Sequence, residues 1–259
     1  MKVFRKFIGV IFSVYAFAIF IVLMFVLFPF VLIASFFGRI QGGNFIFHIC
    51  RFWADVFMLL MGIHHKNIFE APKATGHPVV FVFNHISYMD IPVLMKAFRK
   101  QPIRVLAKAE MAKVPVFGFF YRKATVMVQR GNLQARAKSV RQLKSILKKN
   151  ISIVLAPEGT FNMTHQPLKE FYDGAFKVAI ETQTPIQPVI FLDAYDRMNY
   201  ESVFSLTPGK SRAVFLEEIE VNNFTLQDTG KLKNIVYKKM EAALIKYHAS
   251  WIKNTTHEY

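Results

Sequence analysis

The stretch "FVFNHISYMDIPVL", residues 81–94, joins an apolar run to three polar side chains, Asn84, His85 and Asp90. The run Val79–Phe83 is uninterrupted, as expected for a strand of a parallel sheet that is buried on both faces. In open α/β sheets, ligands bind beyond the carboxyl ends of the strands. The stretch therefore predicts an α/β fold with His85 and Asp90 at the ligand-binding edge of its sheet.

The chain beyond residue 66 repeats this alternation of short apolar runs and amphipathic stretches. Further strands are expected at residues 103–107, 125–128, 151–155, 188–192 and 213–217. Helices are expected at residues 91–99, 133–149, 174–183 and 232–251. Alternation of this kind is typical of an α/β domain with a mostly parallel central sheet flanked by helices.

The five-residue spacing of His85 and Asp90 requires a particular local structure. On one continuous helix these positions would lie about 140° apart, so a loop followed by the first helical turn is needed to bring them together. Asp90 alone is also explained as a helix cap before Pro92, and His85 alone as a loop histidine without chemistry. As a pair they are more informative, because a carboxylate beside an imidazole fixes its tautomer and makes it a better base.

No serine or cysteine nucleophile is obvious beside this pair. The only cysteine, Cys50, lies in an apolar segment, and a single cysteine excludes an intrachain disulfide and a cysteine metal cluster. We therefore expect no metal, and a base that acts directly on the hydroxyl of a substrate.

The N-terminal region predicts a membrane anchor. Residues 7–38 carry no charge and follow a basic start, and as a helix they would reach roughly 45 Å, longer than the ~30 Å hydrocarbon core. The run is longer than the apolar region of a signal peptide, and no small-residue cleavage site follows it. Pro29 is expected to kink or break this helix.

A second apolar stretch, residues 44–63, contains Arg51 and Asp55 and suits an interface or a hairpin better than an independent span. One span and a re-entrant pair turning near Pro29 or near residues 42–43 both stay open, since basic residues flank both sides. Trp53 is either an interfacial anchor or a core residue. We expect helices that anchor the chain over residues 1–65 and a catalytic domain over 66–259.

The chain is strongly basic and apolar. Its 259 residues hold 33 Lys and Arg against 17 Asp and Glu, a net charge of +16, and 53% of them are hydrophobic. This balance fits an anionic membrane surface. Nucleic acid is the competing partner, but the basic helix expected at 133–149 has no interleaved base-stacking aromatics, so we expect no nucleic-acid binding. That helix presents either an ordinary solvated face or a patch for an anionic lipid or a phosphorylated donor.

Five sequence blocks resemble the glycerolipid acyltransferases, the family of 1-acyl-glycerol-3-phosphate (lysophosphatidic acid) acyltransferases. They occur in the family's order: "NHISYMD" (84–90), "LAKAEMAKVPVFGFF" (106–120), "ATVMVQRGN" (124–132), "LAPEGTF" (155–161) and "TPIQPVIF" (184–191). A His-x4-Asp spacing arises easily by chance, whereas ordered blocks across one α/β pattern are specific. The resemblance covers about residues 80–191.

The resemblance implies roles for particular residues. His85 would be the general base and Asp90 its orienter. Lys108 and Arg130 match positions that bind the phosphate of the acceptor. Glu158, Gly159 and Thr160, in the block at 155–161, would shape the acceptor site around the glycerol.

The reaction implied is transfer of an acyl chain from acyl-CoA or acyl-carrier protein, without a cofactor, to the 2-hydroxyl of 1-acyl-glycerol-3-phosphate. We also expect a cell (inner) membrane location with the catalytic domain facing the cytoplasm. The chain departs from the family at Phe161, where an arginine is usual, and this leaves the headgroup open. The alternatives to this lysophospholipid acceptor are the same chemistry on another lysolipid, such as a lyso-aminolipid, and a non-catalytic lipid-binding membrane protein.

Overall fold

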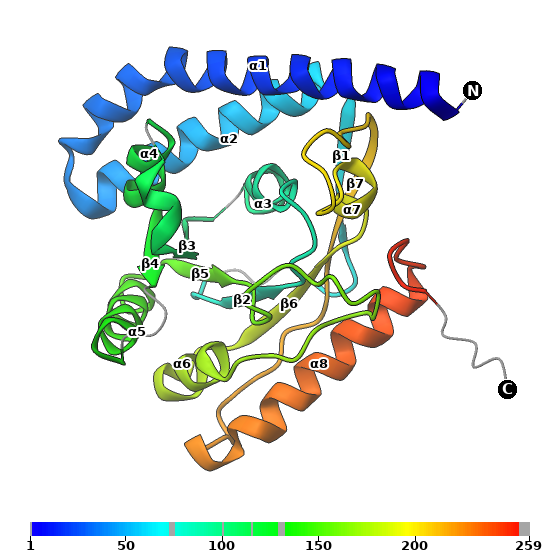
Figure 1. Cartoon of the computed structure of the whole chain (residues 1–259). Helices are drawn as coiled ribbons and strands as arrows, with labels where there is room; N and C mark the ends of the chain where they lie inside the picture. Colours follow the sequence, from blue (N-terminus) through cyan, green and yellow to red (C-terminus); the bar gives the residue numbers. More distant parts are fainter. Residues whose placement is uncertain (1, 73–75, 100, 115, 129–132, 254–259) are drawn as a thin grey trace, which may run out of the picture.

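The computed structural model describes residues 2–72, 76–99, 101–114, 116–128 and 133–253. Its centre is a seven-stranded sheet with the spatial order β1-β7-β6-β2-β5-β3-β4. The strands are β1 Ile63–Phe69, β2 Val80–Phe83, β3 Ile103–Lys108, β4 Thr125–Val128, β5 Ser152–Leu155, β6 Ile186–Phe191 and β7 Gly209–Phe215. Figure 1 shows helices on both faces of this sheet, so the expected α/β class is confirmed.

The sheet is mostly parallel. Strands β2 to β6 all run in one direction, with β2 between β5 and β6 in registered parallel pairs. Among the strands of the described residues, one pair is antiparallel, β6 with β7, and β1 is parallel to β7. The carboxyl ends of β2, β3, β4, β5 and β6 therefore meet at one edge, and the stretch after β2 opens onto that edge.

Two groups of helices cover the sheet (Figure 1). On one side lie α1 Lys2–Ser35, α2 Gly43–Leu60 and α3 Asp90–Ala97. On the other lie α5 Leu133–Leu147, α6 Gly174–Thr182 and α8 Thr229–Lys246. Two further α-helices, α4 Phe117–Ala124 and α7 Ala194–Arg197, and two short 3-10 helices, Ala109–Lys113 and Leu226–Asp228, also belong to the described part of the chain.

The three central strands explain why the apolar runs of the sequence do not alternate. Every residue of β2, β5 and β6 is buried, because helices pack on both faces of these strands. Phe81 lies against Phe98 and Phe215, with ring centroids 4.7 and 6.3 Å away. Burial of such rings rigidly fixes the end of β2, where the polar stretch begins.

The N-terminal helices form a hairpin. Helix α1 continues through Pro29, so of the kink or break expected at that residue the break is wrong. Leu27 and Val31 on either side of the proline are buried, and this packing holds the helix together without the hydrogen bond that proline removes. The chain reverses instead through a turn of π-helix, Gly38–Gly42, close to the glycine pair expected as one of two turning points.

Both helices rest on the α/β domain rather than projecting from it (Figure 1). Near one end of α1 the Ser13 hydroxyl accepts a hydrogen bond from the Leu206 backbone, 3.2 Å away. Near the other end, the ring of Phe28 packs 5.6 Å from that of Phe119 in α4. Trp53 of α2 is half-buried and meets Phe20 of α1 edge-on at 5.6 Å, so its choice between interfacial anchor and core residue stays a prediction.

The residues 7–35 and 40–60 form helices that are long and apolar enough to cross a membrane, judged by length and composition. Strand β1 was not expected from the sequence, because its polar residues 64–67 do not form an apolar run. It also crosses the expected boundary between residues 65 and 66, so the division into anchor and catalytic domain stays a prediction.

Two other expected elements were shifted. Strand β7 begins at Gly209, four residues before the expected strand, because its first half pairs with the polar β1. Helix α8 ends at Lys246 rather than at residue 251, and Trp251 folds back into the core from the turn that follows.

Candidate active site

The polar stretch after β2 forms a loop that ends at the first residue of α3. His85 Nδ1 lies 2.7 Å from Asp90 Oδ2, so the expected pair is in direct contact. The same carboxylate oxygen accepts hydrogen bonds from the backbone N–H groups of Ile86 and Ser87, at 2.9 and 3.0 Å. The Asp90 side chain therefore stabilises the loop that precedes it. It does not cap helix α3, so the capping alternative is wrong.

This contact determines the chemistry of the imidazole. Nδ1 of His85 donates to the buried Asp90 carboxylate, so Nε2 is the acceptor in the neutral ring. The His85 side chain is 25% exposed against 2% for Asp90, which leaves the ring accessible to a substrate while its partner is shielded. An imidazole held in this way can remove a proton from a hydroxyl.

Glu158 joins the loop after β5 to the histidine. Its Oε1 accepts the backbone N–H of His85 at 2.8 Å, and its Oε2 accepts the backbone N–H of Lys169 at 2.9 Å. Burial raises the pKa of the Glu158 carboxyl from its ordinary value to about 7, although both backbone hydrogen bonds lower it. The carboxylate is thus a structural bridge at the reacting end of the sheet.

The loop carrying Glu158 closes on the histidine from its other end as well. The backbone N–H of Asn162 donates to the carbonyl oxygen of His85 at 2.7 Å. Gly159 between them has φ +69°, a left-handed conformation that favours glycine. Both backbone polar groups of His85 are therefore bound by residues 158 and 162, and the intervening side chains are fixed relative to the imidazole.

Phe161, the residue that departs from the family pattern, lies directly against the histidine. Its ring centroid is 4.5 Å from that of His85 in an edge-on arrangement, and 4.9 Å from that of Tyr88. Phe83 flanks the imidazole at 6.0 Å. The imidazole is consequently enclosed by aromatic rings beside its polar partner, which limits its rotation.

The other predicted residues lie around this centre. The Thr160 hydroxyl accepts a hydrogen bond from Lys169 Nζ at 2.8 Å. Lys108 ends β3, at the same edge of the sheet as His85 but two strands away from β2, about 10 Å by strand spacing. Arg130 lies outside the described residues. The structure thus joins His85, Asp90 and the 158–160 block, and brings Lys108 to the same edge.

Three contributors were not found from the sequence. Asn84 exchanges two hydrogen bonds with the backbone of Phe191, at 2.7 and 3.1 Å, and so joins the ends of β2 and β6. Asn162 and Lys169 had no signal, because their partners lie 77 and 11 residues away in the chain. Asn84 was visible in the quoted stretch, but its role depends on the neighbour of β2 in the sheet.

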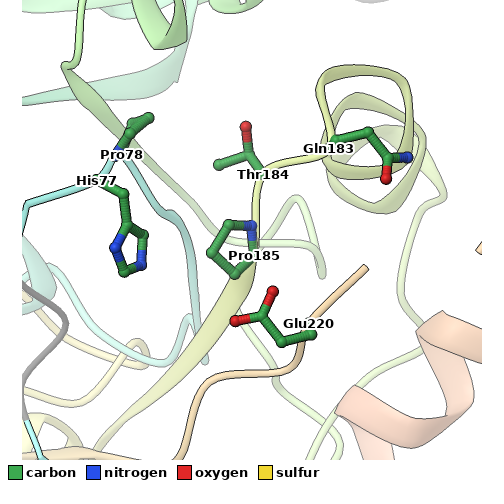
Figure 2. Close-up of a pocket in the computed structure, with 6 residues that line it drawn as sticks. All are labelled: His77, Pro78, Gln183, Thr184, Pro185 and Glu220. Atoms are coloured by element: carbon green, nitrogen blue, oxygen red, sulfur yellow. The ribbon is translucent and has the colours of Figure 1, made fainter. Parts of the chain in front are cut away.

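The structure also has a hollow of about 220 Å³ at the opposite edge of the sheet. Figure 2 shows Pro78 and Pro185 in its wall, and these residues precede β2 and β6. Because His85 follows the carboxyl end of β2, this hollow does not belong to the candidate site. Over the described ranges, no group of three His, Cys, Asp or Glu residues is arranged to hold a metal.

A family model with the description Acyltransferase matches residues 62–192, about half of the chain. This chain belongs to the acyltransferase family. The matched range includes the whole candidate site, from His85 to Lys169, and six of the seven strands begin within it.

Individual relatives of this acyltransferase are identical to it at between a quarter and a third of the aligned residues. A Caenorhabditis elegans protein, provisionally named a 1-acyl-sn-glycerol-3-phosphate acyltransferase, is 29% identical over 206 residues, covering 78% of this chain and 71% of the relative. The enzyme of that name from Cocos nucifera is 28% identical over 156 residues, covering 60% of this chain and 48% of the relative.

The fold of this acyltransferase matches a crystal structure. The 1-acyl-sn-glycerophosphate acyltransferase PlsC from Thermotoga maritima superposes with a TM-score of 0.71, covering 98% of this chain and 100% of that chain, at 20% identity. At this identity the match establishes the fold, including the mostly parallel sheet flanked by helices.

Proposed function

We propose that this acyltransferase transfers an acyl chain to the 2-hydroxyl of 1-acyl-glycerol-3-phosphate and so forms phosphatidic acid. The observation that carries the proposal is the 2.7 Å contact between His85 Nδ1 and Asp90 Oδ2 at the ligand-binding edge of the sheet. Relatives named for this activity, which cover 60 to 78% of the chain, support the choice of acceptor.

The residues of the site provide a base but no nucleophile of their own. His85 Nε2 removes the proton from the acceptor hydroxyl as its oxygen attacks the carbonyl carbon of an acyl thioester. The thioester C–S bond then breaks, and the imidazolium returns the proton to the leaving thiolate. Asp90 keeps the ring in the required tautomer throughout and stabilises the imidazolium between the two steps.

The thioester donor is acyl-CoA or acyl-carrier protein, and both donors contain the leaving thiol that this mechanism requires. The enzyme acts at the cell (inner) membrane with its catalytic domain facing the cytoplasm. The exposed apolar side chains along α1 support membrane association, because a water-exposed surface of this kind is unfavourable. Both acceptor and product reside in a lipid bilayer, so a membrane-bound enzyme meets them there.

The test is an assay of the purified enzyme with a panel of lysolipids and both donors. We expect lysophosphatidic acid to be acylated, and His85→Ala to lower turnover by about 10²–10⁴, the usual effect of losing a general base. Asp90→Asn should also lower turnover. Acylation of a phosphate-free lysolipid alone would assign the same chemistry to another acceptor, and unchanged turnover in folded His85→Ala protein would contradict the mechanism.

A further inference from the structure

Lys169 is bound at both of its ends to the Glu158–Thr160 block. Its backbone N–H donates to Glu158 Oε2 at 2.9 Å, and its ammonium group donates to Thr160 Oγ1 at 2.8 Å. Since Glu158 Oε1 accepts the backbone N–H of His85, one carboxylate joins the backbones of Lys169 and the proposed base. The ammonium therefore has a fixed position relative to the reacting centre.

The ammonium of Lys169 contacts a different kind of group from the ammonium groups of other partly buried lysines. Lys96, Lys144 and Lys233 are partly buried, and each has a carboxylate oxygen within 2.8 Å. Lys169 is also partly buried, but the hydrogen-bond partner of its ammonium is the neutral hydroxyl of Thr160. Within the described ranges, no carboxylate forms an ion pair with its Nζ.

The hydrogen-bonding capacity of the ammonium is only partly used. An ammonium has three N–H donors, and one of them is directed at Thr160. The Thr160 hydroxyl accepts that bond and keeps its own O–H as a donor. The pair thus offers a positive charge and several donors, which is the chemistry that binds a phosphate group. Glu158 interacts with this ammonium only through its charge, while both of its oxygens accept backbone N–H groups.

The residue between this pair and the base cannot supply such a charge. Phe161 follows Thr160 directly, and its ring packs edge-on against the His85 imidazole. The surface of the site next to the base is therefore apolar, and the cation comes from Lys169, eight residues after Phe161.

We propose that the Lys169 ammonium and the Thr160 hydroxyl bind the phosphate of the lysolipid acceptor. This inference rests on the proposed function and identifies a specificity-determining residue within the same site. A phosphate group is also present in the donor coenzyme A, and the experiment distinguishes the two sources.

The test compares Lys169→Met, Lys169→Arg and the control Lys177→Met, which removes an exposed lysine on α6. Michaelis constants are measured for lysophosphatidic acid, for phosphate-free 1-acylglycerol and for the acyl-CoA donor. We expect Lys169→Met to raise the constant for lysophosphatidic acid about 10- to 150-fold, the loss of one charge-assisted contact, and to change the other two constants much less. Lys169→Arg should retain most of the affinity, and Lys177→Met all of it.

Equal effects of Lys169→Met on both acceptors would show a merely structural role and overturn the proposal. A rise confined to the acyl-CoA constant would assign the cation to the donor and overturn it too. Equilibrium binding of lysophosphatidic acid to His85→Ala protein, with and without Lys169→Met, separates this inference from the proposed function. Weakened binding in the double variant would support the phosphate site even if the wild-type enzyme acylated another lysolipid.

Discussion

A single oxygen, Asp90 Oδ2, accepts three hydrogen bonds, from the His85 ring and from two backbone N–H groups of the loop between them. The carboxylate therefore fixes the loop and the imidazole together. Glu158 and Asn162 add bonds to the backbone N–H and carbonyl of His85. The orientation of the base is consequently determined by its backbone as well as by its ring partner.

Phe161 completes this positioning on the ring side. Its edge-on contact with the imidazole, at 4.5 Å, is of the kind that contributes about 0.5–1.5 kcal/mol. We expect Phe161→Ala to lower kcat by up to about tenfold, with a smaller change in KM, because the ring of His85 gains rotational freedom. The kcat of Phe161→Leu should lie between those of the wild type and Phe161→Ala, since leucine retains bulk without the ring. Steady-state kinetics of the three proteins measure this.

Phe161→Arg provides the opposite change at the same position. It removes the ring contact but adds a cation beside Thr160, so we expect a lower KM for a phosphorylated acceptor without a higher kcat. A kcat for Phe161→Ala equal to that of the wild type would mean that the ring does not position the base.

Glu158 predicts a particular dependence of stability on pH. Its pKa is raised from 4.5 to about 7 in the folded protein, mainly by burial, whereas in the unfolded chain it returns to its ordinary value. Between these two values the folded state binds more protons, so the free energy of unfolding falls as pH rises. The contribution of this group is fully present below about pH 4.5 and is lost as pH rises through about 7, at about 1.4 kcal/mol for each unit of pH.

The measurement is urea unfolding of the wild type and Glu158→Gln at pH 4.5, 6 and 7.5. The variant has no titrating group at this position, and other titrations cancel in the difference between the two proteins. We expect the wild type to lose stability relative to the variant as pH rises over this range. A stability difference between the two proteins that stays constant from pH 4.5 to 7.5 would show that the Glu158 carboxyl titrates outside this range.

At the scale of elements, the parts that were predictable are those that the sequence encodes locally. The run Val79–Phe83 reads as a buried strand because its apolar residues are contiguous, and β4 was expected at the residues where it lies. Strand β1 was not predictable, because it is an edge strand in which four consecutive polar residues, 64–67, are exposed or only partly buried, and because its partner, β7, lies about 145 residues later. The role of Lys169 was not predictable either, because its partners, Glu158 and Thr160, meet it only in the folded protein.

Helix α2 of the expected anchor also has polar residues whose partners could not be predicted from the sequence. Its polar residues were read as signs of an interface, and the structure gives them partners within the protein. Arg51 donates to the carbonyl oxygens of Phe98 and Gln101, at 2.7 and 2.9 Å, and Asp55 pairs with Lys96 and Arg99. The polar face of α2 therefore binds the α/β domain.

These two side chains should differ in their effect on stability. Arg51 is buried, so Arg51→Met removes two charge-assisted hydrogen bonds and leaves two carbonyl groups without them, at a cost of about 1.5–3 kcal/mol. Asp55→Asn affects partly exposed ion pairs and should cost below about 1 kcal/mol for each. Denaturant unfolding in a mild detergent measures both. An equal loss in the two variants would mean that burial does not strengthen the Arg51 contacts.

For the whole molecule, the distribution of exposed apolar side chains is uneven. The outer surface of α1 carries a row of them, including Phe7, Phe17, Phe25, Phe30 and Ile33, each more than half exposed. Helix α8 lies on the far side of the sheet, as Figure 1 shows, and has only Ile235 and Ile245 exposed among its large apolar residues. A chain with a net charge of +16 and one apolar side is suited to lie on an anionic bilayer through that side.

The corresponding prediction concerns the binding of lipid vesicles. Burial of one phenylalanine in an apolar phase contributes about 1.5–3 kcal/mol, so Phe17→Gln with Phe25→Gln should weaken partitioning into anionic vesicles at least about a hundredfold. The matched control, Ile235→Gln with Ile245→Gln, changes two exposed apolar residues of α8 and should leave partitioning nearly unchanged. Added salt should weaken binding only in part, because it screens the charge and not the apolar contact. Vesicle flotation at low and high salt measures all of these, and equal losses from the two double variants would show that α1 does not face the membrane.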